Sequence, residues 1–416
     1  MTLKATQQTS RVSDTDATTL DAAPDVVRRM LCCTESKPSA NDISIDRNGS
    51  LESSPQRPSD SFSASSDDTL FGPGMDDDFH RAYQQYSQAS HMGILDPGYQ
   101  TFTSQQGYGS LLFTVKNRTL VVAGDPLCPP HHFRPLLEEL RDFRRANGWR
   151  LAFMGVSGTF AEYCRRRGWL ALQFGRERVV NPTNNEVLQN KGAGKRMNSQ
   201  NRKLLDPKRG GVTLGIYAPT INGIDLELEA RLQALYDNWR EERNCRKQGG
   251  LQTFLTVFDL FSRRDLIFFI YACDRQGRLE GFAALRNLGA SSGFHLDPCI
   301  AAPSATRGIT DLLVVTAMQF LRSAGVSYLS LGHEPFSDLS EVSDKDGMAV
   351  RLACEMYRRV VDSAQLGGKK TYNDKFRPDE ELSSGLYIVF PGGPSLVQQA
   401  VAVMHVANIK IRRIFA

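Results

Sequence analysis

Polar residues whose side chains could do chemistry gather in the stretch Gly281–Phe336. Arg307-Gly308 opens an apolar helical pattern that carries Asp311 in its first turn, and His333-Glu334 follows a short apolar run. Backbone N–H groups at the start of a helix favour anions, so Arg307-Gly308 could hold a phosphate group. Asp311 could take part in the chemistry, or it could only stabilise the helix, because a carboxylate in the first turn interacts favourably with the helix dipole.

The elements that must position these residues form a strand–helix–strand pattern. Two apolar runs, separated at Gly289 and Gly293, predict strands, and a third run at Val326–Leu331 predicts another. Between them, apolar residues from Ile309 to Phe320 recur at helical spacing, and Gly325 follows as a residue that can end the helix. This βαβ pattern places the polar groups at strand ends and at a helix N-terminus, where α/β proteins keep their active sites.

Composition divides the chain into an acidic tail and a basic body. Residues 1–70 contain 21 Ser or Thr and one aromatic residue, Phe62, so this segment buries too little apolar surface to fold and is predicted to be disordered. Residues 1–80 carry 7 Lys or Arg against 14 Asp or Glu, a net charge of −7. Because the whole chain carries +4, residues 81–416 carry +11.

The eight cysteines give no sign of a metal centre. They show neither Cys-x-x-Cys spacing nor a partnering His pattern, so we expect no zinc and no thioredoxin-like site. Their scatter among apolar residues is typical of a reducing compartment. The N-terminus lacks the apolar core of a secretory signal, and no run reaches the ~20 apolar residues that span a bilayer. These patterns predict a soluble or peripheral protein.

Two similar successions of elements are predicted along the chain. Hairpin strands at 111–115 and 120–123 precede a helix at 133–143, a buried strand at 151–156, a short helix at 160–167 and a strand at 169–174. The stretch 266–331 repeats the order of hairpin, strand, helix and strand. This element order is the outline of an N-acyltransferase (GNAT-like) half-domain. The sequence therefore predicts an α/β protein of tandem GNAT-like halves with mixed sheets.

A basic segment, Lys191–Arg209, lies between the two successions, and it has seven basic residues and one acid interleaved with Asn, Gln, Ser and Gly. It lies close to the arginines at 165–167 and to Arg176 and Arg178. Such a surface suits a phosphate backbone, because release of condensed ions drives that binding. Basic patches also meet anionic lipid, and a charge run can be no more than a solvated helix face. Charge alone leaves these alternatives open.

The end of the chain, 394–416, is predicted to be an amphipathic helix. It mixes Val, Ala, Met and Ile with Lys410, Arg412 and Arg413. Such a helix could pack on the domain, or it could lie in a membrane interface with its basic end at the headgroups. On the second interpretation it would dock the protein on the membrane that holds its substrate.

Seven short motifs, in order, are similar to those of one family, the C-terminal catalytic domains of bacterial lysylphosphatidylglycerol synthases, or multiple peptide resistance factors. The matching residues are Gly124-Asp125-Pro126, Gly194-Lys195-Arg196-Met197 with Asn201-Arg202, Trp239-Arg240, Leu296-Asp297, Gly308 to Asp311, Leu331-Gly332 with Pro335 and Ser337, and Lys375-Phe376 with Pro378. They extend over about residues 80–391. That family moves an amino acid from aminoacyl-tRNA to a lipid hydroxyl on a tandem acetyltransferase-like fold, so the resemblance implies this fold and this activity.

Other residues depart from the bacterial pattern. The two arginines that the family carries soon after its Leu-Asp pair are replaced here by Pro298 and Cys299, so its contact with a phospholipid headgroup does not carry over. The amino-acid sequences of residues 297–303 and 163–169 resemble those of the fungal branch, whose members aminoacylate the 3β-hydroxyl of ergosterol. One fungal type is fused to an aspartyl-tRNA synthetase, and a free-standing type, the ergosteryl-glycine synthases, uses glycyl-tRNA. Because the sequence has no synthetase module, we expect the free-standing, glycine-transferring type.

The reaction that the resemblance implies is acyl transfer between esters, which needs a base, stabilisation of an oxyanion and positive charge for tRNA. Asp297, Asp311, His333 and Glu334 are the candidates for the acid–base or ammonium-binding groups, and the sequence does not separate these roles. Lys375 and Arg307 are candidates for the oxyanion or a phosphate. The substrate-binding candidates are Arg307, Gly308, Trp239, Arg286 and Gly332, and the tRNA-binding candidates are Lys195, Arg196, Arg202 and Lys203.

These inferences give a complete expectation for the chain. Its parts are a disordered Ser/Thr-rich tail at 1–78, a first half at 79–220, a second half with the active site at 221–393, and the C-terminal helix at 394–416. The expected partners are glycyl-tRNA, a sterol and a membrane surface, with no cofactor and no metal, and the expected location is cytoplasmic, peripheral to membranes or lipid bodies. A phospholipid or diacylglycerol acceptor, an acyl-coenzyme A N-acyltransferase that uses Arg307-Gly308, and a non-catalytic RNA- or membrane-binding module are the alternatives.

Overall fold

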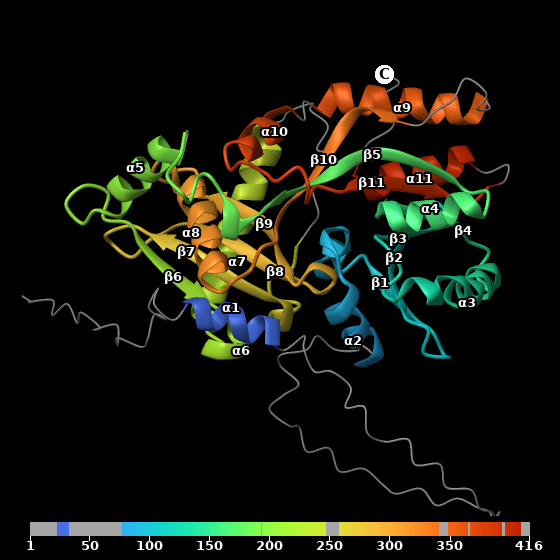
Figure 1. The fold of residues 1–416 in the computed structure, drawn as a ribbon, viewed down its shortest axis with the longest axis horizontal. Helices are drawn as coiled ribbons and strands as arrows, with labels where there is room; N and C mark the ends of the chain where they lie inside the picture. The colour runs from blue at the N-terminus through green and yellow to red at the C-terminus, as the bar shows by residue number, and fades with distance from the viewer. Residues whose placement is uncertain are drawn as a thin grey trace, which may run out of the picture.

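The strands of the protein form one continuous sheet. The computed structural model describes residues 23–32, 77–192, 194–246, 258–340, 348–364, 367–392 and 396–408 of the 416-residue chain. Within these ranges lies a mixed sheet of 11 strands in the order β1-β2-β3-β4-β11-β5-β10-β9-β8-β7-β6, which runs across Figure 1. The α/β class with mixed strands is confirmed, and strands from both predicted halves share this sheet.

The first group of elements follows the order predicted from the sequence. It comprises β1 (Gln100–Thr103), β2 (Ser110–Lys116), β3 (Thr119–Ala123), α3 (Phe133–Ala146), β4 (Arg150–Val156), α4 (Gly158–Arg166) and β5 (Leu170–Val180). β2 and β3 form the predicted hairpin, and its turn residues Asn117 and Arg118 both have positive φ, as a two-residue hairpin turn requires. Helix α3 then connects β3 to the parallel strand β4.

The second group repeats this arrangement. It comprises β6 (Thr213–Tyr217), α7 (Leu226–Arg246), β7 (Ile267–Cys273), β8 (Leu279–Leu288), β9 (Gly293–Ala301), α8 (Ile309–Ser323), β10 (Leu329–Ser340), α9 (Met348–Ala364), α10 (Gly367–Asp374) and β11 (Gly385–Phe390). Helix α8 connects β9 to the parallel strand β10, so the predicted βαβ unit is confirmed. Gly325 follows α8 with a φ of +80°, a conformation that costs least without a Cβ atom.

Smaller elements complete the described structure. They are α1 (Ala23–Cys32), α2 (Asp77–Tyr86), α5 (Gly194–Leu205), α6 (Pro219–Asn222), α11 (Leu396–Val406) and the 3₁₀ segments η2 (Ala89–Leu95), η3 (Pro130–His132), η4 (Pro182–Asn184), η5 (Arg264–Leu266) and η6 (Gly289–Ser291). None of the described helices combines the length and the hydrophobicity needed to cross a bilayer.

The last strand of each group joins the other group. β11 lies between β4 and β5, and β5 lies between β11 and β10. The element order along the chain did not predict this exchange, because strand pairing over 200 residues depends on packing of the whole sheet. As a result, β5, β10 and β11 run together at the centre of the molecule.

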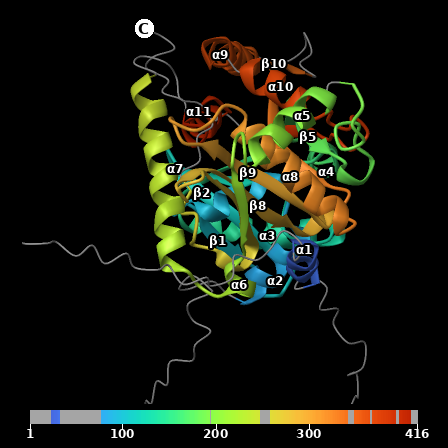
Figure 2. The same ribbon diagram turned by 90° about the vertical axis from the view of Figure 1, so that its left-hand side faces the viewer.

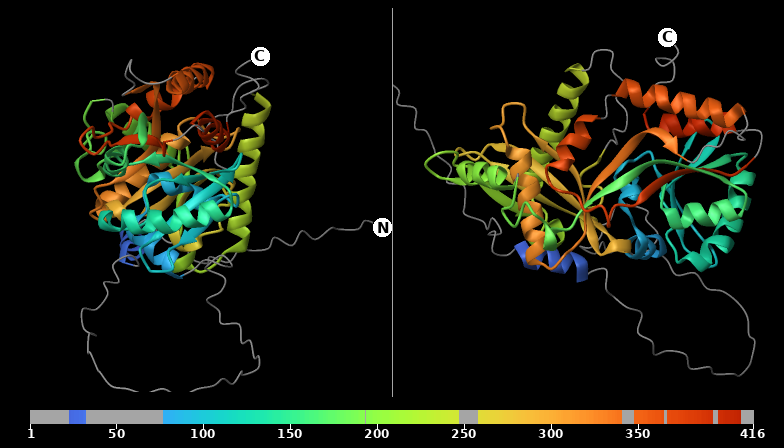
Figure 3. Two further views of the ribbon diagram at one scale, coloured as in Figure 1. Left: turned by 90° about the vertical axis from the view of Figure 1, so that its right-hand side faces the viewer. Right: turned by 45° about the horizontal axis from the view of Figure 1, so that its top comes forward.

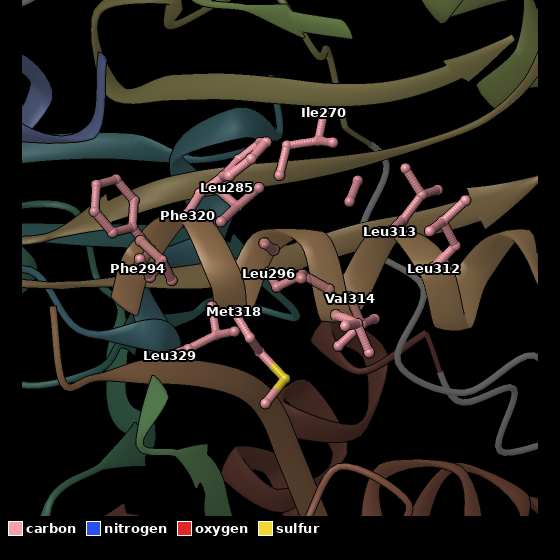
Figure 4. Close-up of a cluster of buried hydrophobic side chains, with 14 of the residues drawn as sticks. Ile270, Leu285, Phe294, Leu296, Leu312, Leu313, Val314, Met318, Phe320 and Leu329 are labelled. Atoms are coloured by element: carbon pink, nitrogen blue, oxygen red, sulfur yellow. The ribbon is translucent and has the colours of Figure 1, made fainter. Parts of the chain in front are cut away.

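Helix α8 packs on the second part of the sheet with an apolar face. Its buried side chains Leu312, Leu313 and Met318 meet strand residues that include Leu285 and Phe294, as Figure 4 shows. The long helix α7 lies on the opposite side, so that β8 and β9 are seen between α7 and α8 in Figure 2. This two-sided cover explains why β8 is buried along nearly its whole length.

The C-terminal helix belongs to the core of the protein. In Figure 1, α9 lies above β5 and β11, and α3 and α4 lie lower in the view, while α11 contacts α9 and the strands β3 and β4. Ala400, Ala402 and Val403 of α11 are buried against Val121, Leu172 and Ile388. Of the two interpretations of the C-terminal helix, packing on the domain holds for residues 396–406, because most of their apolar side chains are covered by the sheet. Lys410, Arg412 and Arg413 lie outside the described residues.

Part of the predicted disordered tail is a helix. Residues 23–32 form α1, which is blue in Figure 3 and lies against α8. Val26, Val27 and Met30 are buried in the same apolar cluster as α8, so the prediction of disorder is wrong for these ten residues. The composition of the tail concealed this short amphipathic pattern. The rest of the predicted tail, 1–22 and 33–76, lies outside the described residues.

Candidate active site

The candidate residues gather where two parallel strands part. β9 and β10 pair only at Phe294 with Leu329 and at His295 with Ser330. Beyond this point β9 continues to Ala301 along β8, and β10 continues to Ser340 along β5. The candidate carboxylates lie beyond the parting, on β9, on β10 and in the first turn of the connecting helix α8.

Asp311 and Lys375 form an ion pair in this region. Lys375 Nζ lies 3.2 Å from Asp311 Oδ2 and 3.3 Å from Oδ1, and it also lies 4.8 Å from the ring centroid of Tyr372. The Asp311 side chain is 18% exposed and that of Lys375 is 46% exposed, so the pair is open to a substrate on the lysine side. The structure thus joins two residues that the sequence could place only separately.

Cys299 lies close to both aspartates of the site. Its Sγ is 3.8 Å from the carbonyl oxygen of Thr310. Burial raises the pKa of the Cys299 thiol, and the carboxylates of Asp297 and Asp311 raise it further. The thiol is therefore uncharged at neutral pH and is a poor nucleophile. The thiol of Cys299 consequently adds no charge to the region of Asp297 and Asp311.

Aromatic side chains from α7 stand near Asp297. Burial raises the pKa of Tyr236, and Asp297 is close enough to raise it further. Trp239 stacks on Tyr236 with ring centroids 6.3 Å apart, and the guanidinium of Arg240 lies 5.4 Å from the Tyr236 centroid. Trp239 therefore belongs to an aromatic stack, and the other ring of this stack, Tyr236, is the one close to Asp297.

Glu334 is held by three cations. Its Oε2 lies 3.2 Å from Arg178 Nε, and its Oε1 lies 3.4 Å from both Arg176 Nη2 and Lys370 Nζ. Arg178, which is 3% exposed, also contacts Asp374 and Glu380 at 2.7 Å each. Three carboxylates thus balance three cations, and both oxygens of Glu334 lie within ion-pair distance of a cation, although Oε2 receives no hydrogen bond. Hydrogen bonds from Arg178 and Arg176 outweigh desolvation and lower the pKa of Glu380.

One short segment connects Glu334 to Asp311. Helix α10 contributes Lys370 to the first carboxylate, and Lys375, directly after the helix, contributes to the second. Five residues of helix extend roughly 7–8 Å, so the two carboxylates are anchored to opposite ends of this segment. Movement of α10 would therefore change both ion pairs together.

His333 and Glu334 lie on opposite faces of the sheet. The sequence placed both just after a strand, but β10 continues through them to Ser340. In the register with β5, His333 faces Glu177 and Glu334 faces Arg176, and successive residues of a strand point to opposite faces. His333 Nε2 lies 3.3 Å from Ser90 Oγ instead. The structure therefore separates the two candidates His333 and Glu334, because side chains alternate along the strand at this point.

Two predicted substrate-binding residues have other surroundings. Arg286 is 1% exposed, and its guanidinium contacts the Tyr83 hydroxyl, the carbonyl oxygens of Gln88 and Ala89, and His295 Nδ1. Gly332, with a φ of +86°, lies at the register shift between Ser330 and His333. The structure therefore gives Arg286 an internal anchoring role, against the prediction, and Gly332 a conformational one.

Helix α5 places its basic residues beside the start of α8. Gln200 Nε2 donates to the Arg307 carbonyl oxygen at 3.2 Å, and a Cβ atom on Gly308 would lie 2.4 Å from that nitrogen. Met197 and Leu204 bury one face of α5 in the core. Lys195, Arg196, Arg202 and Lys203 are exposed on the other face, and in the described part of the chain none of the four makes an ion pair. These cations are available to a phosphate backbone.

The basic surface around α5 is smaller than the one predicted from the sequence. The arginines at 165–167 belong to the end of α4, which lies at the opposite end of the sheet from α5 in Figure 1. Arg178 is buried among carboxylates, so it cannot meet a nucleic acid. Lys370 and Tyr372 were not predicted from the sequence, since α10 carries no motif, whereas the Arg-Glu-Arg alternation at 176–178 could have indicated a buried charge network.

Comparison with known proteins places most of the chain in one group. Residues 79–387 match the family model described as "Phosphatidylglycerol lysyltransferase, C-terminal". An MprF-like domain protein of Mycobacterium tuberculosis is 26% identical over 244 residues, which cover 57% of this chain and 48% of the relative. The phosphatidylglycerol lysyltransferase of Bacillus subtilis is 22% identical over 308 residues, or 74% of this chain and 34% of that protein. The match thus spans about half or less of these relatives.

Two solved structures share the fold. The C-terminal domain of a putative lysylphosphatidylglycerol synthetase from Agrobacterium fabrum superposes with a TM-score of 0.60 and 19% identity, covering 80% of this chain and 96% of that one. The L-PGS from Bacillus licheniformis gives a TM-score of 0.63 and 17% identity, covering 82% and 99%. At this identity the two structures establish a common architecture.

Proposed function

The chain belongs to the family of phosphatidylglycerol lysyltransferase C-terminal domains, and from this premise we propose that it transfers an amino acid from aminoacyl-tRNA to a lipid hydroxyl. The observation that carries the proposal is the contact between α5 and α8. The hydrogen bond from Gln200 to Arg307 joins an exposed basic helix to the helix that carries Asp311. A bound tRNA acceptor stem on α5 would therefore have its aminoacyl end near the Asp311–Lys375 pair.

The proposed reaction exchanges one ester for another. The acceptor oxygen attacks the aminoacyl carbonyl carbon, its proton passes to a base, and the terminal ribose oxygen leaves with a proton. One C–O bond forms and one breaks, so the step is close to thermoneutral and needs no ATP. Positioned acid–base groups and donors aimed at the oxyanion are the usual sources of acceleration for such a step.

The two aspartates are assigned different roles. Asp311 is assigned as the base that takes the proton from the lipid hydroxyl. Lys375 beside it can stabilise the oxyanion that forms on the aminoacyl carbonyl. Asp297 is assigned the α-ammonium of the aminoacyl group, in a region where Tyr236 lies close to its carboxylate. Glu334 positions α10 through Lys370 and is assigned no proton transfer, because it is buried beside three cations that favour its charged form.

We propose glycyl-tRNA as the donor and the 3β-hydroxyl of ergosterol as the acceptor. Support for a neutral acceptor comes from Pro298 and Cys299, which stand where the family has arginines that would meet a phosphate group. An uncharged thiol near two aspartates offers no positive charge to the phosphate of a phospholipid headgroup. The donor is cytoplasmic and the acceptor is a membrane lipid, so the protein would work as a cytoplasmic protein at the surface of a membrane or lipid body.

The deciding experiment is transfer of labelled amino acid into lipid. The purified protein is incubated with ¹⁴C-glycyl-tRNA and liposomes that contain ergosterol, phosphatidylglycerol or diacylglycerol, and the organic extract is examined for an alkali-labile ester. We expect product with ergosterol, loss of product after Asp311→Asn, and full activity after Asp142→Asn, an exposed matched change on α3. Product with a phospholipid or diacylglycerol alone would overturn the sterol assignment. No product with glycyl- or aspartyl-tRNA would overturn the sterol transfer itself.

An acyl-coenzyme A N-acyltransferase is the second candidate. Gly308 opens α8 with a φ of +104°, which leaves backbone N–H groups at the helix start for a pyrophosphate. The Asp311 carboxylate in the same turn would repel that anion, which ranks this function second. Saturable binding of coenzyme A in calorimetry, with activity that survives RNase, would favour it.

A further inference from the structure

A polar cavity of about 170 Å³ lies outside the site described above. It opens where β5, β10 and β11 meet the segment that precedes η2, and its polar wall comes from Gln88, Ser90, Ser157, Glu177, Tyr328 and Ser384. At roughly 30 Å³ for each water molecule, it has room for about five water-sized groups. Nothing in the proposed transfer reaction uses these residues.

Glu177 is the charged group of this cavity. It is 5% exposed, and its Oε1 has no hydrogen-bond partner. Hydroxyl groups of Ser330 and Tyr328 hydrogen-bond to the carboxylate, although burial outweighs them and raises the pKa of Glu177. Because Glu177 faces His333 across the strands, it lies on the opposite face of the sheet from Glu334 and Arg176.

Among the residues that the structure describes, no lysine or arginine contacts Glu177 directly. Arg286 is near enough to act on it electrostatically, but its guanidinium is committed to Tyr83, to two backbone carbonyls and to His295. Of the residues that line the cavity, none carries a positive charge. A buried carboxylate that is supported only by two hydroxyl groups is costly, and a bound cation would reduce that cost. The same charge disfavours any anionic ligand.

We propose that this cavity binds a primary ammonium group carried on a small uncharged body. The ammonium pairs with Glu177 Oε1. The hydroxyls of Ser90 and Ser157 already donate to the Gly155 carbonyl and to Asp125, so their oxygens, together with the side-chain oxygen of Gln88, accept hydrogen bonds from the remainder of the ligand. Because Asp297 is assigned to the ammonium of the aminoacyl donor, the ligand of this cavity is a free small amine. The binding itself is independent of the proposed function, and only the assignment to a free amine draws on it.

Calorimetry with simple probes tests the binding. Glycinamide carries an ammonium and a neutral carbonyl, acetamide lacks the ammonium, and glycine adds a carboxylate. We expect saturable binding of glycinamide to the intact protein, with glycine and acetamide at least tenfold weaker. Glu177→Gln should weaken glycinamide at least tenfold, and Glu162→Gln, the same change on the exposed surface of α4, should leave it unchanged.

A second variant guards against a misfolded Glu177 mutant. Ala290 is exposed on η6 and lines the cavity, so Ala290→Leu narrows it without touching the carboxylate. This variant should also weaken glycinamide at least tenfold while its unfolding transition stays that of the wild type. Three results would each overturn the proposal: no saturable binding to the wild type, unchanged binding to a folded Glu177→Gln, or unchanged binding to Ala290→Leu.

The transfer assay then separates the cavity from the donor site. Non-competitive inhibition by glycinamide against glycyl-tRNA is the expected result, and competitive inhibition that is lost in Glu177→Gln would overturn the assignment to a free amine. Since the calorimetry contains neither tRNA nor lipid, a protein that binds glycinamide but transfers nothing refutes the proposed function and leaves the cavity assignment standing.

Discussion

Lys375 Nζ lies 3.2 Å from Asp311 Oδ2, although 64 residues separate the two in the sequence. Asp311 begins the helix that connects the parting strands, and Lys375 follows the short helix α10, whose other contact is Lys370 with Glu334. The pair therefore couples the start of α8 to the central charge network. A substrate that displaces Lys375 from Asp311 would act on both.

Asp311→Asn and Lys375→Met should each lower the transfer rate by about 10²–10⁴-fold, the range for positioned acid–base groups. Because the pair is partly exposed, the free energy of unfolding should change by no more than ~1 kcal/mol. Single-turnover transfer and urea unfolding measure the two effects. Lys116→Met, at the exposed end of β2, is the matched control. Full activity of both site variants would place the chemistry elsewhere.

Removing one cation from the exposed face of α5 should weaken tRNA binding equally for all tRNA species. Each of Lys195→Ala, Arg196→Ala, Arg202→Ala and Lys203→Ala should reduce the dependence of log K on log[salt] by about 1, because one fewer phosphate is neutralised. Filter binding across a salt series measures this slope. Arg134→Ala on α3 removes an equal charge from a distant exposed helix. An unchanged slope in all four variants would exclude α5 as the tRNA contact.

The acid stability of the protein should depend on His91. His91 is fully buried, Gln88 N–H donates to its Nδ1 at 2.9 Å, and its Nε2 therefore donates to the Asp125 carbonyl at 3.0 Å. Burial lowers the pKa of His91 from 6.5 to about 4. The unfolded chain thus binds an extra proton between these values, so the stabilisation is complete above about pH 6.5 and is lost as the pH falls to about 4.

The size of this effect follows from the pKa difference, and it amounts to about 3 kcal/mol across that window. His91→Gln keeps a donor and an acceptor but cannot titrate, so its free energy of unfolding should fall less steeply between pH 6.5 and 4 than that of the wild type. Urea unfolding at several pH values measures the two slopes. His131→Gln, at an exposed position, should leave the slope unchanged. Parallel wild-type and His91→Gln curves would contradict the assignment.

Helix α11 should matter for folding and not for membrane docking. Val403 is 5% exposed, so Val403→Asp buries a charge and should lower the free energy of unfolding by about 3 kcal/mol or more. Val397, on the same helix, is 37% exposed, and Val397→Asp should change it by about 0.5 kcal/mol or less. Transfer to liposomal and to detergent-dispersed sterol should decline together in the first variant. A selective loss on liposomes in either variant would restore a docking role.

The sequence by itself determined the local structure. The apolar spacing at 309–320 and Gly325 predicted α8 and its end, and Asn117-Arg118 marked the β2–β3 turn. The motif residues Asp297 and Asp311 were also correctly placed in one region, because a βαβ unit brings the carboxyl end of its first strand to the start of the helix that follows. Periodicity and turn chemistry act over a few residues, so they can be read directly from the chain.

Tertiary structure alone decided which of these residues meet. It carried β10 beyond Leu331, so that His333 and Glu334 diverge, and it inserted β11 between β4 and β5. It buried Arg178 among three carboxylates and brought Lys375 to Asp311. These contacts join segments far apart in the chain, and their free energies depend on how all elements pack at once. A charge that the sequence assigns to the surface can therefore become a buried ion pair, and an apolar helix with a basic end can belong to the core.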